Sequence, residues 1–171
     1  MKNNAILMTG ATVVVSNAGG PATIIADASS KYNLKLTTLS EKTVSELSEI
    51  LPKTASLINP VDIIGDADHT RYENTLRTVL KDPNVNSCII VSTPQMMLNM
   101  ESLADVTIKI NNEFKEKTIL SCMMAVAGIE NALADSFFVF CIITRISLLI
   151  KNLLHHPSWI DHSSARDLPF F

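Results

Sequence analysis

The regular hydrophobic pattern of the chain starts with an apolar run, a glycine turn and an amphipathic segment. Residues 12–15 are β-branched and uncharged, which is typical of a strand buried on both faces of a parallel sheet. Residues 17–20 predict a turn, because glycine allows backbone conformations and close approaches that other residues do not. Pro21 is expected at the first helical position, where a missing N–H removes no hydrogen bond. The helix that follows has an apolar side made by Ile24, Ile25 and Ala28.

The alternation of strand and helix patterns continues along the chain. Short apolar or β-branched runs predict further strands at residues 34–37, 61–64, 87–92 and 117–123. Amphipathic spacing predicts the intervening helices at residues 41–51, 69–81 and 101–114. Alternating elements of this kind form an open, mostly parallel sheet with helices on both faces and right-handed crossovers. The predicted fold class is therefore α/β.

Polar residues mark where two of these helices begin. Ser40 precedes the helix at residue 41, and its hydroxyl can accept a hydrogen bond from a free N–H of the first turn. Either Asp66 or Asp68 can cap the next helix, which begins near His69. The predicted buried stripe of that helix is Tyr72, Leu76, Val79 and Leu80.

Three polar loops follow predicted strands, at Asn17–Gly20, Asn59–Asp62 and Thr93–Gln95. Ligands of open α/β sheets bind at the carboxyl ends of the strands, where these loops should gather. The helix after Gly20 directs free N–H groups and its positive dipole end out of the sheet, which favours an anion. An ordinary βα turn without a ligand fits the same residues. The motif is neither a Walker A loop nor GxGxxG, so the sequence shows no nucleotide fingerprint.

Composition limits the classes of function. The 171 residues are long enough for one domain with a core, and the net charge of −3 provides no basic footprint for nucleic acid. The cysteines, Cys88, Cys122 and Cys141, are far apart, which fits a reducing cytoplasm and argues against a structural zinc site. Residues 1–10 are expected to be a lead-in without a secretory signal. A domain boundary inside a longer protein would fall there.

The pattern changes after about residue 134. Residues 137–150 are nearly all apolar, but Arg145 interrupts them and they are shorter than the roughly 20 residues of a membrane span, so no membrane partner is expected. Residues 155–171 show no periodicity. No regular element would hold a metal geometry there, so no metal site is predicted from His155, His156, Asp161 and His162.

Several motifs now occur in one order at natural spacings. They are Val-Val-Ser-Asn-Ala-Gly-Gly-Pro at 14–21, Asn-Pro-Val-Asp at 59–62, Gly-Asp-Ala at 65–67, Asp-Pro-Asn-Val at 82–85 and Thr-Pro-Gln at 93–95. Over roughly residues 10–124 the chain resembles the second flavodoxin-like CoA-ligase domain of the ADP-forming acyl-CoA synthetases, which are relatives of succinyl-CoA synthetase. The same domain occurs in protein acetyltransferases that join a synthetase-like region to an acetyltransferase domain. The resemblance implies a flavodoxin-like sheet.

The resemblance also implies a chemistry. The family uses ATP to form an acyl-phosphate and then a thioester, and a phosphohistidine on a swinging loop carries the phosphoryl group between sites. The helix after Gly20 looks like one of two helices whose N-termini hold that phosphohistidine. The predicted phosphate-site residues are therefore Asn17, Ala18, Gly19 and Gly20, with Asn59 and Asp62 as loop contributors. CoA, ATP or ADP, and Mg²⁺ are implied for the complete enzyme, and none is expected to bind this chain alone.

The chain departs from the family pattern in places. Ala22 stands where the family usually has glycine, and Met-Ala-Val-Ala-Gly at 124–128 stands where it tends to have a Met-Gly-Gly turn. The sequence contains no family histidine motif, and His69 does not lie in one. The CoA-binding and ATP-grasp domains of the family are also missing from it.

The sequence therefore predicts two parts. Residues 1–134 are an incomplete flavodoxin-like CoA-ligase domain whose sheet is truncated at its C-terminal edge. Residues 135–171 are an apolar and then irregular tail, and a frame shift or broken gene is the hypothesis for them. The predicted function is a module of an ADP-forming acyl-CoA synthetase, with other synthetase domains or subunits as partners in a hetero- or homo-oligomer. The alternative is a non-catalytic regulatory or dimerising domain of a synthetase-like protein acetyltransferase.

Overall fold

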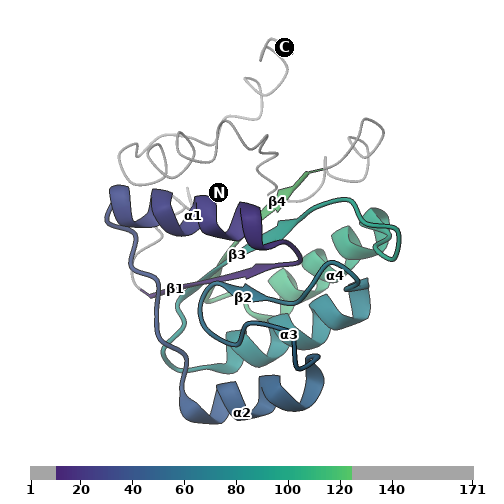
Figure 1. Cartoon of the computed structure of the whole chain (residues 1–171). Coiled ribbons are helices and arrows are strands. Elements are labelled where there is room, and N and C mark those ends of the chain that lie inside the picture. Colours follow the sequence, from purple (N-terminus) through teal and green to yellow (C-terminus); the bar gives the residue numbers. More distant parts are fainter. Residues whose placement is uncertain (1–10, 125–171) are drawn as a thin grey trace, which may run out of the picture.

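A computed structural model of the chain describes residues 11–124. These residues form a four-stranded parallel sheet in the order β2-β1-β3-β4 (Figure 1). The strands are β1 (Thr12–Ser16), β2 (Val61–Asp62), β3 (Ser87–Ser92) and β4 (Thr118–Met123). The predicted lead-in, the tail with its histidines, and the continuation of the sheet beyond β4 lie outside the described residues.

Helices cover both faces of the sheet, as the sequence predicts (Figure 1). The helices are α1 (Gly19–Lys31), α2 (Glu41–Ile50), α3 (His69–Lys81) and α4 (Met100–Glu113). Val14 packs with Ile25 of α1, whereas Val13 and Val15 pack with apolar residues of α2, α3 and α4. The side chains of β1 thus alternate between two cores. This confirms the predicted α/β class and explains why the whole of β1 is apolar or buried.

Side-chain caps set where three helices start. Ser40 Oγ accepts the Thr43 N–H at 3.3 Å, which confirms the predicted cap of α2. Asp68 Oδ1 accepts the Arg71 N–H at 2.8 Å, so Asp68 rather than Asp66 caps α3. Asp66 pairs instead with the guanidinium of Arg71. Asn99, which the sequence analysis did not single out, caps α4.

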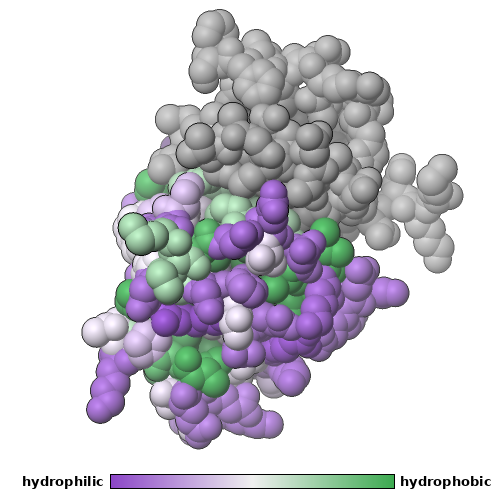
Figure 2. Space-filling view, turned by 90° about the vertical axis from the view of Figure 1, so that its right-hand side faces the viewer, coloured by the Kyte–Doolittle hydropathy of each residue, from purple (hydrophilic) through white to green (hydrophobic). Residues whose placement is uncertain are grey.

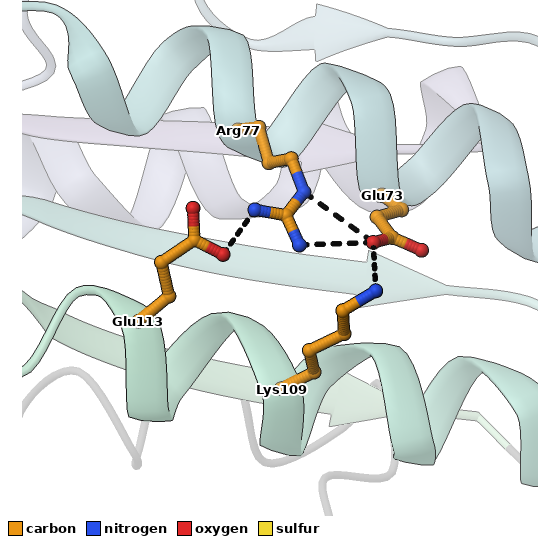
Figure 3. Close-up of polar contacts among 4 residues, drawn as sticks. All are labelled: Glu73, Arg77, Lys109 and Glu113. Atoms are coloured by element: carbon orange, nitrogen blue, oxygen red, sulfur yellow. Dashed lines mark hydrogen bonds and ion pairs between the residues drawn. The ribbon is translucent and has the colours of Figure 1, made fainter.

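Ion pairs connect α3 with α4 on the surface (Figure 3). Glu73 Oε1 accepts from Lys109 Nζ at 2.7 Å and from Arg77 Nη2 at 3.0 Å, and Arg77 also contacts Glu113. The hydrogen bonds from Lys109 and then Arg77 lower the pKa of Glu73 below its ordinary value. Residues 36 positions apart are thereby held side by side.

The structure corrects several predicted boundaries. The strand expected at residues 34–37 is a single bridge between Leu36 and Thr12. The strand expected at 61–64 ends at Asp62, because Ile64 takes a positive φ of 68° and the chain turns away from the sheet. Helix α1 begins at Gly19, so Pro21 is its third rather than its first residue. Pro21 still lies in the first turn of α1, where a backbone N–H would have no hydrogen-bond partner within the helix.

The side chain of Asn59 completes the edge of β1 between Leu36 and β2. Asn59 Oδ1 accepts the Val14 N–H at 2.9 Å, and Asn59 Nδ2 donates to the Thr12 C=O at 2.7 Å. Nδ2 also donates to the Thr37 C=O at 2.9 Å. The carboxamide therefore replaces a missing strand residue, because buried peptide groups must find partners. The side chain of Asn59, which the sequence analysis names as a loop contributor, thus lies in the sheet edge, and its contribution to a phosphate loop stays a prediction.

We predict that Asn59→Asp destabilises the full chain by roughly 2–4 kcal/mol. The carboxylate retains an acceptor for Val14 but places an oxygen against the two carbonyls that now receive Nδ2. Urea unfolding of both variants measures the change. Asn74→Asp, at an exposed position on α3, is the control and should stay within about 0.5 kcal/mol. Equal effects of the two variants would contradict the role of Asn59.

The ion pairs of Glu73 predict a pH dependence of stability. Because the folded pKa of Glu73 is lowered, its stabilisation is present above the ordinary carboxyl pKa and is lost as the pH falls through the lowered value. The difference in unfolding free energy between the unmodified chain and Glu73→Gln should therefore shrink towards low pH. Glu49→Gln on α2, which has no ion pair within residues 11–124, should show no such decline. A pH-independent difference for Glu73→Gln would disprove the effect.

Candidate functional site at the β1–α1 junction

The turn from β1 into α1 is fixed by its own residues. The Ser16 hydroxyl accepts the Ala18 N–H at 3.0 Å and donates to the Ala18 C=O at 2.8 Å. Ala18 is the N-cap of α1, with an extended backbone (φ −149°, ψ 125°) and no side-chain cap. The Ala18 C=O also receives the Ala22 N–H at 3.3 Å. The Ser16 hydroxyl therefore makes its hydrogen bonds within the turn, and no side chain caps the start of α1.

The first N–H groups of α1 are available to a ligand. Within residues 11–124 the Gly19 and Gly20 N–H groups donate to no group of the protein. Both glycines are exposed, and a Cβ on Gly20 would meet no atom within 4 Å. Unpaired donors and the positive end of the helix dipole lie together here. Gly19 and Gly20 thus form an open helix end with unpaired donors, and the binding of an anion there stays a prediction.

Unlike the two exposed glycines, Asn17 is buried. It is 1% exposed, and its side chain pairs with the backbone of Thr93. Asn17 Nδ2 donates to the Thr93 C=O at 3.0 Å, and Asn17 Oδ1 accepts the Thr93 N–H at 2.9 Å. Oδ1 also accepts the Thr93 hydroxyl at 3.1 Å. The Asn17 carboxamide therefore joins the carboxyl end of β1 to that of β3 and positions the turn.

Tyr72 supports the same junction from α3. Its hydroxyl accepts the Asn17 N–H at 3.1 Å and donates to the Val91 C=O at 2.7 Å. Burial raises the pKa of this phenol, so the hydroxyl keeps its proton. The sequence predicts Tyr72 only as part of a buried stripe. The sequence signal for this bridging role was the Tyr72 hydroxyl itself, because a buried tyrosine hydroxyl must find a hydrogen-bond partner.

The carboxylate of Asp62 lies beside the start of α1. Asp62 Oδ1 accepts the Ile64 N–H at 2.9 Å. Asp62 Oδ2 is 3.3 Å from the position that a Cβ on Gly19 would take. The Asp62 carboxylate therefore places a negative charge beside Gly19, while the space around Gly20 stays open. Asp62 narrows the space at Gly19, and its contribution to a phosphate loop stays a prediction.

The loops at the ends of the strands meet as the sequence predicts. Gln95 Nε2 donates to Thr93 Oγ1 at 3.2 Å, and Thr93 contacts Asn17. A Cβ on Gly65 would lie 3.7 Å from the Asn17 C=O and 3.8 Å from the Gln95 side chain. In the described part of the chain, no group of three His, Cys, Asp or Glu side chains could hold a metal ion. No helix among residues 11–124 is long and apolar enough to cross a membrane.

The described residues thus form a parallel α/β sheet with an exposed helix N-terminus at its carboxyl edge. The sequence pattern of the Ligase-CoA domain matches residues 12–144, and the chain belongs to this family. This confirms the family predicted from the sequence. The match extends past residue 134, where the predicted domain ends.

The chain is similar to archaeal ADP-forming ligases. It is 41% identical over 164 residues to a 4-hydroxybutyrate–CoA ligase (ADP-forming) of Nitrosopumilus maritimus (strain SCM1), covering 94% of this chain and 23% of that protein. It is 36% identical over 118 residues to the alpha subunit of acetate–CoA ligase (ADP-forming) II of Pyrococcus furiosus, covering 66% of this chain and 25% of the subunit. The chain thus spans about a quarter of the length of these relatives.

Solved structures share the fold. Protein PH0766 of Pyrococcus horikoshii OT3 matches with a TM-score of 0.75 and 30% identity, over 85% of this chain and 35% of that one. The apo form of the dinucleotide-forming acetyl-coenzyme A synthetase 1 of Ca. Korarchaeum cryptofilum matches with a TM-score of 0.73 and 20% identity, over 83% and 32% of the two chains. Both matches use about a third of a longer chain.

We predict that Tyr72→Phe destabilises the full chain by about 1–3 kcal/mol, because the Asn17 N–H and the Val91 C=O lose their buried partner. Amide exchange at Asn17 should become faster in the same variant. Tyr32→Phe, at the half-buried C-cap of α1, is the matched control and should change stability by less than about 0.5 kcal/mol. Unchanged exchange at Asn17 would contradict the bridging role of the phenol.

Proposed function

We propose that this chain is a module of an ADP-forming acyl-CoA synthetase. The complete enzyme would convert an acid, CoA and ATP to acyl-CoA, ADP and phosphate. Membership of the Ligase-CoA domain family and the similarity to ADP-forming acid–CoA ligases support this proposal. Because the chain spans about a quarter of those relatives, other domains or subunits would supply the CoA site, the ATP site with its Mg²⁺, and the histidine. The spread of the cysteines supports the cytoplasm as the compartment.

In this proposal the Asn17–Gly20 turn helps to hold the phosphoryl group of a phosphohistidine. The observation that carries it is the pair of exposed N–H groups at Gly19 and Gly20, at the positive end of α1. Such an end stabilises an anion by roughly 0.3–2 kcal/mol. Asn17 would position these donors through Thr93. Ala18 would keep the extended backbone that aims them outward.

Asp62 sets the side from which the phosphoryl group would approach. Its carboxylate stands next to Gly19 and would repel an incoming dianion. The space around Gly20 is open. The phosphoryl oxygens would therefore lie over the Gly20 N–H, away from Asp62. The relatives described above are ligases, which favours this function over the regulatory or dimerising domain of a protein acetyltransferase.

The test requires a complete synthetase. The matching residues of the Nitrosopumilus maritimus relative can be exchanged for this chain, because the two are 41% identical. In that chimera, Gly20→Asp places a negative charge where the dianion would lie, and a side chain fits there without a clash. We expect phosphohistidine labelling from γ-labelled ATP to fall about tenfold.

Gly20→Asn is the matched control, because asparagine has the same shape as aspartate without the charge. It should retain most of the labelling, and both variants should unfold at similar temperatures. Equal labelling of Gly20→Asp and the unmodified chimera would contradict the proposed phosphate site. Equal losses in both variants would show that the side chain blocks the site sterically, and this would also contradict the electrostatic role.

A further inference from the structure

One face of the sheet carries an apolar surface that the described helices cover only in part. Within residues 11–124, α1 is the only helix with residues in the core on this face, whereas α2, α3 and α4 pack on the other face (Figure 1). The strand residues on the α1 side are Val14 of β1, Ile89 and Val91 of β3, and Leu120 and Cys122 of β4. Because all of them are apolar, this face needs a cover across three strands.

Helix α1 is too narrow to supply all of that cover. Its main strand contacts are with β1, and β4 lies two strands away from β1 in the sheet. Two strand spacings are about 9.5 Å, which is close to the full diameter of a helix of roughly 10 Å. A helix that packs over β1 therefore reaches β3 but not the far side of β4.

The side chains of β4 on this face are nevertheless buried. Leu120 and Cys122 are 3% and 4% exposed, and Val91 on the neighbouring strand is fully buried. The outer surface of the described residues keeps apolar side chains in separate patches on a mostly hydrophilic face (Figure 2). Since the burial of Leu120 and Cys122 arises within a single chain, the cover of β4 belongs to this chain, outside residues 11–124.

The segment at residues 137–150 has the composition and the length for this cover. It is nearly all apolar, and it follows β4 along the chain. A helix over these residues would be about 21 Å long, which matches the roughly 20 Å of the six-residue strands β3 and β4. In the lead-in, residues 1–10, the apolar run at 5–8 is short. Fully extended, that run spans only about 13 Å.

The similarity to known ligases also extends over this segment. The alignment with the Nitrosopumilus maritimus relative covers 94% of the chain, so residues 137–150 lie inside it whichever end is unmatched. The pattern of the Ligase-CoA domain continues to residue 144. This continuity favours a segment that packs with the domain over an unrelated tail.

We propose that residues 137–150 form the layer that covers β3 and β4 on the α1 side of the sheet. Packing there removes Leu120 and Cys122 from water together with the apolar side chains of the segment, and burial of apolar surface drives such a contact. The proposal rests on the burial of the sheet and not on the start of α1. It is therefore independent of the proposed function.

Methyl NOEs in the full chain test this contact directly. With the Ile, Leu and Val methyl groups labelled, we expect NOEs from Leu120 and Val91 to the Ile and Leu methyl groups of residues 142–150. NOEs from Leu120 to residues 1–10 instead would assign the cover to the lead-in and overturn the proposal. A complete absence of NOEs to residues 137–150, as a tail produced by a frame shift predicts, would also overturn it. So would NOEs that join only differently labelled chains, because they would assign the face to a second copy.

Thiol labelling with N-ethylmaleimide under native conditions tests the cover by substitution. The double variant Ile143→Asp/Leu148→Asp places charges on opposite sides of the segment, in a helix or in a strand, so one of them meets the sheet. We expect Cys122 to react about tenfold faster than in the unmodified chain, because opening of the cover exposes a thiol that burial protects. Cys88 lies fully buried on the other face, and burial raises the pKa of its thiol to about 12. It should stay unreactive, which reports that the rest of the sheet is intact.

The matched control is the double variant Ile6→Asp/Leu7→Asp in the lead-in, which should leave Cys122 protected. Continued protection of Cys122 in the variant of residues 143 and 148 would contradict the proposal, whatever the control shows. If Cys88 reacts in that variant as well, the domain has unfolded, and the NOEs of the unmodified chain then decide which segment covers β4.

Discussion

The pairing of the Asn17 carboxamide with the backbone of Thr93 is the contact on which the candidate site depends. It joins the ends of the two neighbouring strands β1 and β3 across 76 positions of sequence. A carboxamide buried to this degree must satisfy both its donor and its acceptor, and the peptide of Thr93 does so reciprocally. The Tyr72 hydroxyl adds a second link at the same place. The start of α1 and the start of the β3–α4 loop are therefore fixed relative to each other.

The edge of the sheet positions the charge beside this junction. Strand β2 is only two residues long, and the Asn59 carboxamide takes the place of strand residues next to it. This arrangement holds Asp62 in register with Ser16, with its carboxylate close to Gly19. A fixed negative charge thus lies on one side of a helix end that otherwise attracts anions. The electrostatic asymmetry of the site follows from the way the sheet edge is completed.

The described residues contribute positioned donors and a helix dipole, and the chain spans about a quarter of the length of the relatives that it matches. Within residues 11–124, most residues are of a type that their local structure favours, as the helix N-caps Ser40, Asp68 and Asn99 show.

The sequence by itself determined the helices and most of the strands, the parallel α/β class, and the position of the Asn17–Gly20 turn at the carboxyl edge, because periodicity and glycine turns are local signals. It also indicated which loops would meet. Only the tertiary structure decided what each polar side chain does. Asn17 pairs with Thr93 and Asn59 pairs with Val14 over 76 and 45 positions, and such partners depend on strand order and register. A polar residue in a loop motif looks the same in the sequence whether it faces a ligand or completes a sheet edge.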